Sequence, residues 1–340
     1  MSLETYLQVY LPALDRELRL VADRFLPGPE EFDRMVRYHL GWVDEEGLPA
    51  QAGRGKQIRP AIVLLCTELV GGDWQQALPA AAAVELLHNF SLIHDDVEDN
   101  SPLRRGRPSV WKVWGKANAI NVGDAMFALA HLALWRLAEC KVPFPVVLEA
   151  FHLYERTCLT LTRGQHLDMA FEHRLDVSID EYVAMIDAKS AALIATSAQL
   201  GAVVGGIPLD ETEPFVSFGR SLGRAFQIRD DILGIWGDPE LTGKSAATDI
   251  VSRKKSLPVL YGLERSSELV EIYSHEHQGE AELDRAVAIL DGVGAREFAA
   301  DYEARCFRDV DASLDALSVF SGAVVGVLRV LVAGLLGRSV

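Results

Sequence analysis

The sequence predicts an all-α protein, and three observations support that fold class. Alanine and leucine recur at helical spacing in long apolar stretches. No stretch alternates apolar and polar residues with β-branched side chains, as a half-buried strand would. Short breaks that contain glycine or proline separate the apolar stretches. No tract rich in Pro, Gly or Ser divides the chain, so residues 1–340 are expected to form a single domain.

The expected helices are apolar around most of their circumference, which is typical of helices buried inside a large bundle. Their residues are 77–96, 123–140, 182–205 and 215–236. The breaks between elements fall at residues 70–73, 141–145, 205–208, 236–244 and 292–295.

A further apolar run covers residues 317–337 and approaches the length of a membrane span. Arg329 lies in the middle of this run, and a charge at the centre of a bilayer is costly. Glycines along the run also permit close helix packing. The run is therefore expected to be a buried C-terminal core helix rather than a membrane anchor.

The composition is that of a folded globular chain, with 49% apolar and 24% charged residues among 340. The net charge of −16 disfavours partnership with nucleic acid or an anionic membrane surface. An anionic ligand must therefore be bound locally, by clustered bases or by bound cations. The four cysteines form no C-x-x-C pair, and the first residues contain no apolar signal core, so a cytoplasmic protein with reduced cysteines is expected.

Three acids cluster at the end of the first expected helix. Asp95 and Asp99 are four residues apart and Asp96 and Asp99 are three apart, so both pairs share a helix face. Like charges this close repel unless a cation lies between them, and carboxylate oxygens suit Mg²⁺. His88 lies two turns earlier on the face of Asp95. A merely solvated acidic helix end is the alternative, but residues 86–94 are too apolar for a solvated face.

A second acidic group lies in the expected helix over 215–236. Gln227 precedes Asp230 and Asp231 by three and four residues, so the amide and the acids share a face. Gly234 stands four residues after Asp230, where the first cluster carries an acid, and Asp238 follows in a loop. Two such groups on buried helices of one bundle are expected to face each other, as metal-binding carboxylates do in bundle cores.

Basic residues are spread over several segments that could bind phosphate, through bidentate arginine or point-charge lysine. Taken singly, most of them also fit an ordinary surface charge. Lys189 is the exception, because it interrupts an apolar helix. The bases are Lys56, Arg59, Arg104, Arg105, Lys189, Lys244, Lys254 and Lys255.

These motifs together resemble the trans-isoprenyl diphosphate synthases, the polyprenyl synthetase family, and specifically its short-chain geranylgeranyl and farnesyl type. The matching stretches follow the order of the family and cover roughly residues 50 to 260. They are GKQIRP (55–60), HNFSLIHDDVEDNSPLRRG (88–106), AKS (188–190), FQIRDDILG (226–234), TGK (242–244) and KKSLP (254–258).

The resemblance implies an isoprenoid-synthase-type bundle of about ten or more helices around a central cavity, usually as a homodimer. It implies condensation of isopentenyl diphosphate onto an allylic diphosphate, with about three Mg²⁺ ions when substrate is bound. The implied metal-binding and catalytic acids are Asp95, Asp96, Asp99, Asp230 and Asp231, and Lys189 is also implied to be catalytic. The implied allylic-substrate residues are Arg104, Lys189, Ser190, Gln227, Lys244 and Lys254. The implied isopentenyl diphosphate pocket is Lys56, Arg59, His88 and Arg105.

One departure from the family pattern concerns the second acidic motif. The family usually has a third acid there, and Gly234 takes its place. Metal binding on that side is expected to rest on Asp230 and Asp231, with Asp238 as a candidate for compensation. The family often has threonine where Ser190 and Ser256 stand, and the hydroxyl is retained.

The implied chemistry breaks an allylic carbon–oxygen bond to give a carbocation and diphosphate. Metal ions neutralise the charge that grows on the leaving group, lysines and Arg104 add positive charge, and apolar helices exclude water. No side-chain base is evident, so by analogy the released diphosphate takes the proton. His88 is expected to bind diphosphate rather than to act as a base.

Product length is partly encoded next to the first acids. Phe90 lies five residues before Asp95, about 7.5 Å back along a helix, and Ser91 leaves space beside it. In the family this combination is typical of a short-chain enzyme, with a C20 product favoured over C15. The alternative is that Phe90 is an ordinary core residue.

Two other functions remain open at this stage. A class I terpene cyclase shares the fold class and an acidic metal motif, but it does not need GKQIRP or the Arg104–Arg105 pair. An inactive regulatory subunit of a heteromeric prenyl synthase would have lost metal ligands, and Gly234 is the one such change in this chain.

Overall fold

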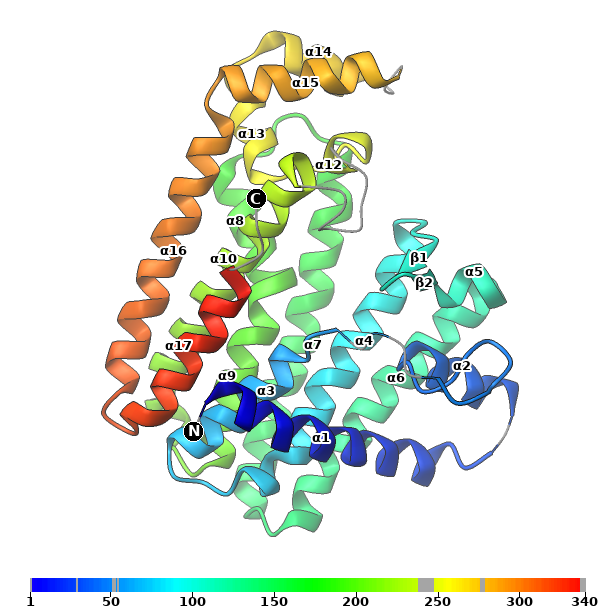
Figure 1. Ribbon diagram of the computed structural model, residues 1–340, viewed down its shortest axis with the longest axis vertical. Coiled ribbons are helices and arrows are strands. Elements are labelled where there is room, and N and C mark those ends of the chain that lie inside the picture. The colour runs from blue at the N-terminus through cyan, green and yellow to red at the C-terminus, as the bar shows by residue number, and fades with distance from the viewer. Residues whose placement is uncertain are drawn as a thin grey trace. The chain divides into compact units, whose positions relative to one another are not determined.

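The protein is described by a computed structural model over residues 2–28, 30–50, 53, 55–237, 248–275 and 279–336 (Figure 1). Within these residues nearly every element is a helix. The sheet that they form is one short antiparallel hairpin of β1 (Leu103–Arg104) and β2 (Arg107–Pro108). The all-α fold class is thereby confirmed.

The chain divides into two compact units, residues 1–153 with 197–212 and residues 154–196 with 213–340, called here unit 1 and unit 2. Helices α7 (Phe144–Glu172) and α9 (Ala192–Val204) supply residues to both units. The single domain expected from the sequence stays a prediction.

Besides its parts of α7 and α9, the described part of unit 1 contains the hairpin and six whole α-helices. These helices are α1 (Leu3–Phe25), α2 (Glu31–His39), α3 (Ile58–Leu69), α4 (Leu78–Glu98), α5 (Val110–Trp114) and α6 (Lys116–Trp135). Helices α4 and α6 pack along each other (Figure 1). Five successive residues of α4, Ala80 to Val84, are fully buried, which explains why this helix is apolar on all sides.

Helix α1 is tied to α3 by one shared acid. The hydroxyls of Tyr6 and Tyr10 donate to the two oxygens of Glu68, at 2.9 and 2.5 Å. Tyr10 is buried, so its hydroxyl needs such a partner. These bonds connect residues about sixty positions apart and stabilise α1 against the core of unit 1.

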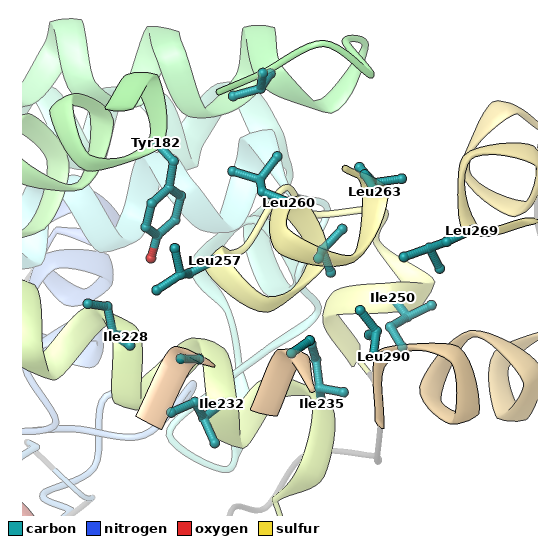
Figure 2. Packing of buried hydrophobic residues seen from close by; sticks show 14 of the residues in the cluster. Tyr182, Ile228, Ile232, Ile235, Ile250, Leu257, Leu260, Leu263, Leu269 and Leu290 are labelled. Carbon is teal, nitrogen blue, oxygen red and sulfur yellow. The ribbon is translucent and has the colours of Figure 1, made fainter. Parts of the chain in front are cut away.

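Unit 2 holds the remaining helices and one π-helical turn, Asp187–Ala191. Its other elements are α8 (Ile179–Ile186), α10 (Glu213–Trp236), α12 (Thr248–Val251), α13 (Leu257–Leu263), α14 (Ser267–Ser274), α15 (Glu280–Gly292), α16 (Ala295–Leu317) and α17 (Gly322–Leu336). Helices α10 and α16 pack along each other (Figure 1). Figure 2 shows the core that joins α8, α10, α12 and α13, with Ile232 and Ile235 on α10 and Ile250 on α12.

The expected helices are found with shifted ends. Helix α4 covers nearly all of 77–96, and α10 covers 215–236. The expected helix over 123–140 begins earlier, and residues 136–140 form a separate 3-10 turn. The expected helix over 182–205 is interrupted by the π turn, in which the Ala192 amide donates to the Asp187 carbonyl. Periodicity could not reveal this turn, because a π turn adds one residue without changing the apolar composition.

The C-terminal apolar run is divided at the turn before α17. Arg329 donates to Asp311 and Asp315 of α16, each at 2.6 Å, which gives the charge in the run its partners. Residues such as Val324 and Leu328 are buried on the other side of the helix. No helix in the described part of the chain is long and apolar enough to cross a membrane.

The π turn lies against a glycine of α7, and this contact yields a prediction. A Cβ atom at Gly164 would lie 2.3 Å from the Lys189 backbone nitrogen, so Gly164→Ala forces a backbone shift. Such overpacking costs about 1–3 kcal/mol. We expect Gly164→Ala to lower the free energy of unfolding by that amount, as measured by urea denaturation.

The matched control is the same substitution at Gly326, inside α17, where nothing lies within 4 Å of the added atom. Gly326→Ala should leave stability unchanged or raise it by up to about 1 kcal/mol, because alanine favours helix. Equal stabilities of the two variants would contradict the close approach at Gly164.

Candidate functional site

The first acidic cluster lies at the C-terminal end of α4. Asp95 and Asp96 belong to the last helical turn, and Asp99 is the residue that caps it. The carbonyl groups at this end carry partial negative charge, so acids there are unfavourable without a nearby cation. Three acids in this position therefore indicate a site that binds positive charge.

Arg104 supplies part of that charge. The Asp96 side chain is 2% exposed and accepts hydrogen bonds from Nε and Nη2 of Arg104, at 2.9 and 2.5 Å. Burial raises the pKa of the Asp96 carboxyl above its usual value, and Arg104 opposes that rise. Asp96 is thus held by Arg104. Asp99 is exposed at the helix end, and Asp95 is partly exposed.

The hairpin after α4 sets the directions of the two adjacent arginines. Arg105 and Gly106 form its two-residue turn, both with positive φ (52° and 76°). Such turns match the twist of antiparallel strands, and the glycine adopts this geometry without strain. In Arg105, a residue with a side chain, the positive φ costs conformational energy. The Arg105 guanidinium lies near Gly55, with Nε 3.4 Å from the position that a Cβ atom on Gly55 would take.

The predicted residues Arg59, Arg104 and Arg105 of unit 1 come together around His88. Nη1 of Arg59 lies 3.3 Å from Nε2 of His88. A guanidinium only donates hydrogen bonds, so Nε2 accepts and the ring proton is on Nδ1. Burial, followed by the charges of Arg59 and Arg105, lowers the pKa of His88 well below its usual value. A histidine with so low a pKa is a poor proton acceptor. Lys56 is exposed at the start of this segment.

Two buried residues of this region were missed by sequence analysis. Glu85 is 3% exposed, and its Oε1 accepts a hydrogen bond from Asn89 Nδ2 at 3.1 Å. Burial raises the pKa of the Glu85 carboxyl, while the charge of Arg105 opposes that rise. The available signal was an acid in a wholly apolar run, three residues before His88 and so on the same helix face.

Arg104 and Arg105 also line a small pocket. It is lined by Tyr38, His39, Gly53, Arg104, Arg105, Arg107, Pro108, Ser109 and Val110. Burial and then the charges of Arg105 and Arg104 lower the pKa of His39 to about 3. Arg107 donates to the carbonyl of Val43 and lies over the Tyr38 ring, 3.9 Å from its centroid. His39 had not been singled out, because α2 carries no motif, and Arg107 lies one residue beyond the RRG (104–106) that ends a matching stretch.

The second acidic group, in unit 2, is organised around Asp231. This carboxylate is fully buried and accepts four hydrogen bonds, the number that its lone pairs allow. The donors are Gln227 Nε2 (3.0 Å), Lys254 Nζ (3.2 Å), Tyr182 Oη (2.6 Å) and the Leu257 amide (3.2 Å). Asp231 therefore joins α8, α10 and the start of α13, and two of the residues that donate to it, Tyr182 and Leu257, are labelled in Figure 2.

Two further predicted residues, Ser190 and Lys189, and the Lys254 already named complete this group. Ser190 Oγ donates to Gln227 Oε1 at 2.5 Å. Lys189 Nζ donates to Oδ2 of Asp168 on α7 at 2.5 Å, a partner that the sequence did not reveal. Lys254 lies near three acids: burial alone would lower its pKa, but Asp231, Asp249 and Asp168 outweigh burial and raise it well above the usual value.

The predicted residues thus form two groups, one in each unit. Unit 1 brings together Asp95, Asp96, Asp99, Arg104, Arg105, Arg59 and His88, and unit 2 brings together Lys189, Ser190, Gln227, Asp230, Asp231 and Lys254. Lys244 and Asp238 lie outside the described residues. The expectation that the two acidic groups face each other stays a prediction.

Phe90 belongs to an aromatic row between α4 and α6. Its ring centroid lies 4.7 Å from that of His94 and 5.1 Å from that of Phe127. Phe127 in turn lies 4.5 Å from His131. Ser91 donates to the His88 carbonyl at 2.8 Å, so its hydroxyl is turned back onto its own helix.

These donor sets fit a hard divalent cation such as Mg²⁺. Each unit offers carboxylate oxygens that are only partly enclosed, on Asp95 and Asp99 in one and on Asp230 in the other. Asp96 and Asp231 already accept hydrogen bonds from arginine or from several donors. Both kinds of acid are useful at a metal site, because held carboxylates orient the segments that carry the others.

A family model described as polyprenyl synthetase matches residues 48–290 of this chain. That range contains all the predicted site residues. It begins just before the first basic motif and ends within α15.

Among curated relatives, a (2E,6E)-farnesyl diphosphate synthase of Mycobacterium bovis is 48% identical over 244 residues. The match covers 72% of this chain and 66% of the relative, just under two thirds of its length. A geranylgeranyl diphosphate synthase of Mycobacterium tuberculosis is 40% identical, over 78% of this chain and 76% of the relative. Among solved structures, a polyprenyl synthetase from Streptomyces coelicolor A3(2) has a TM-score of 0.86 at 36% identity, covering 98% of each chain.

The low pKa of His39 gives a pH-dependence that can be measured. The folded value is about 3, below the usual 6.5, so between these pH values the unfolded chain binds more protons. The free energy of unfolding should therefore decrease as the pH is lowered through this window, by up to about 1.4 kcal/mol per pH unit from this group. His39→Gln should show a shallower decline in the free energy of unfolding between pH 6.5 and 4.5.

The control is His152→Gln, which replaces an exposed histidine of α7 and should retain the wild-type decline. If His39→Gln loses stability with falling pH as steeply as the wild type, His39 is not held neutral by its surroundings.

Proposed function

Because the chain belongs to the polyprenyl synthetase family, we propose that it is a short-chain trans-prenyltransferase. It condenses isopentenyl diphosphate with an allylic diphosphate in a Mg²⁺-dependent, head-to-tail reaction, with a C20 product favoured over C15. The observation that carries this proposal is the arrangement of unit 1. There, the acids at the end of α4 adjoin a group of arginines with His88. The acids can bind cations, and the arginine–histidine group can bind anions.

The arginine–histidine group binds isopentenyl diphosphate in this proposal. Arg59 and Arg105 supply positive charge and bidentate donors, and the Nδ1 proton of His88 supplies a neutral donor. Buried Glu85 balances part of the charge when no diphosphate is bound. Lys56, exposed at the entrance of this segment, adds a further point charge.

The acidic clusters serve the allylic diphosphate. Mg²⁺, when bound, neutralises the charge that develops on the leaving diphosphate. In unit 1, Asp95, Asp96 and Asp99 hold Mg²⁺, with Arg104 fixing Asp96. In unit 2, Asp230 and Asp231 also hold Mg²⁺, and Lys189, Lys254, Ser190 and Gln227 bind the allylic diphosphate. Positive charge that is already in place lowers the barrier to ionisation without reorganisation.

The number of Mg²⁺ ions, about three, and a homodimeric assembly come from the family resemblance. A cytoplasmic location comes from the scattered cysteines and the lack of an apolar signal core. The presence of two acidic groups rather than one supports the binding of more than one Mg²⁺ ion. The isoprenoid diphosphate class of substrate is supported by the names of the relatives.

The test is turnover by the purified chain alone. Labelled isopentenyl diphosphate is incubated with each allylic primer in turn, with Mg²⁺ and with EDTA, and the products are sized. We expect product only when both diphosphates and Mg²⁺ are present. Product from geranylgeranyl diphosphate alone would instead indicate a cyclase, and no turnover under any condition would indicate an inactive subunit; either result refutes the proposal.

Product length gives a second test, centred on the aromatic row. We propose that Phe90 limits chain growth, with the ring of Phe127 behind it. Removal of the ring opens space along α4, so Phe90→Ala should lengthen the main product by at least one five-carbon unit, as read by mass spectrometry. Phe144→Ala, which removes an exposed ring at the start of α7, is the control. An unchanged product in Phe90→Ala would leave Phe90 as a core residue.

A further inference from the structure

Gly234 occupies the position at which the second acidic group lacks its third carboxylate, and another carboxylate stands in that space. A Cβ atom built on Gly234 would lie 2.5 Å from Cγ of Asp249 and 2.6 Å from both of its carboxylate oxygens. Real Cβ atoms essentially never come so close to another side chain, so Gly234 is what admits the Asp249 carboxylate to the surface of α10.

The location of Asp249 follows from the packing of α12. Ile250, the next residue, is fully buried in the same apolar cluster as Ile232 and Ile235 of α10 (Figure 2). The Asp249 carbonyl accepts the Lys254 amide at 2.9 Å, which closes the turn after α12. The side chain of Asp249 is therefore fixed against α10 by its own backbone and by its neighbour.

The carboxylate lies on the face of α10 that Asp230 occupies. Residues four apart on a helix have Cβ atoms about 5–6 Å apart, and Asp230 and Gly234 have this spacing. Asp249 thus presents its carboxylate next to Asp230, as an acid at position 234 would. Lys254 lies beside this carboxylate as well, since its Nζ is 3.2 Å from Asp231 and 3.9 Å from Asp249.

Asp231 differs in its surroundings from Asp230 and Asp249. Its oxygens receive four donors and none of its surface is exposed, whereas Asp249 is 14% exposed. Asp231 is suited to hold α8, α10, Lys254 and α13 in register, and less suited to meet an incoming cation.

We propose that Asp249 supplies the third carboxylate of the second acidic group, so that Asp230 and Asp249 bind the Mg²⁺ of this group and Asp231 positions them. This rests on the proposed function and refines it: Asp249 replaces the acid missing at position 234, and Asp231, given there as a metal ligand, positions the ligands instead. Lys254 neutralises part of the acidic charge before the cation arrives.

The experiment measures the Mg²⁺ dependence of turnover together with binding of inorganic diphosphate. Asp249→Asn keeps the size of the side chain and removes its charge. It should raise the Mg²⁺ concentration for half-maximal turnover at least tenfold. It should also reduce, by half or more, the Mg²⁺-dependent rise in Tm that inorganic diphosphate gives to the wild type. The second measurement does not depend on catalysis.

A relocation variant separates a lost ligand from a damaged fold. Asp249→Ala should show the same defect, and adding Gly234→Asp returns a carboxylate to the helix in the space that Asp249 vacates. The double variant should recover the wild-type Mg²⁺ midpoint to within about threefold. The control is Asp311→Asn, which removes an exposed acid of α16 and should behave as the wild type in both measurements.

Two results would overturn the inference: a wild-type Mg²⁺ midpoint and Tm response in Asp249→Asn, or a double variant no better than Asp249→Ala. Either can occur while the wild-type chain makes product, so the failure of this inference is distinct from that of the proposed function. Absence of turnover in the wild type would refute the function itself, and the Tm response to diphosphate would still decide the role of Asp249.

Discussion

A carboxylate can be buried only where hydrogen-bond donors replace the water it has lost, and both candidate sites depend on this constraint. Asp231 satisfies it with four donors from four segments of unit 2. Asp96 satisfies it with Arg104 from the hairpin after its own helix. In each unit the most buried acid therefore arranges the groups around it, and its less buried neighbours are the ones exposed to ligand.

Local departures from regular backbone geometry serve the same sites. The π turn presents Lys189 and Ser190 toward Asp168 and Gln227, and the glycine of α7 against it allows the backbone to approach. The hairpin turn directs Arg104 toward Asp96 while Arg105, with its positive φ, lies toward Gly55. Backbone strain of about 1–3 kcal/mol at such points is typical of functional sites and is offset by the packing elsewhere.

Charge balance links the two groups to the acidic character of the whole chain. A protein of net charge −16 repels diphosphates at long range, so recognition has to be local. In unit 1, the charges of Arg105 and Arg59 act on the buried acid Glu85. In unit 2, lysines lie against acids, and each acid that binds a cation leaves a lysine more able to bind an anion. In the proposed function, metal and diphosphate binding are thereby coupled.

The sequence by itself determined the all-α class, the courses of α4 and α10, and most of the residues at both sites, because helical period and motif spacing are local properties. It did not reveal Asp168, Asp249, Glu85 or His39 as members of these sites. Asp168 meets Lys189 across two helices, and Asp249 meets Gly234 through the packing of Ile250. Such pairings are decided by which helix faces pack together, so only the tertiary structure could show that a glycine in one motif makes room for an acid in another.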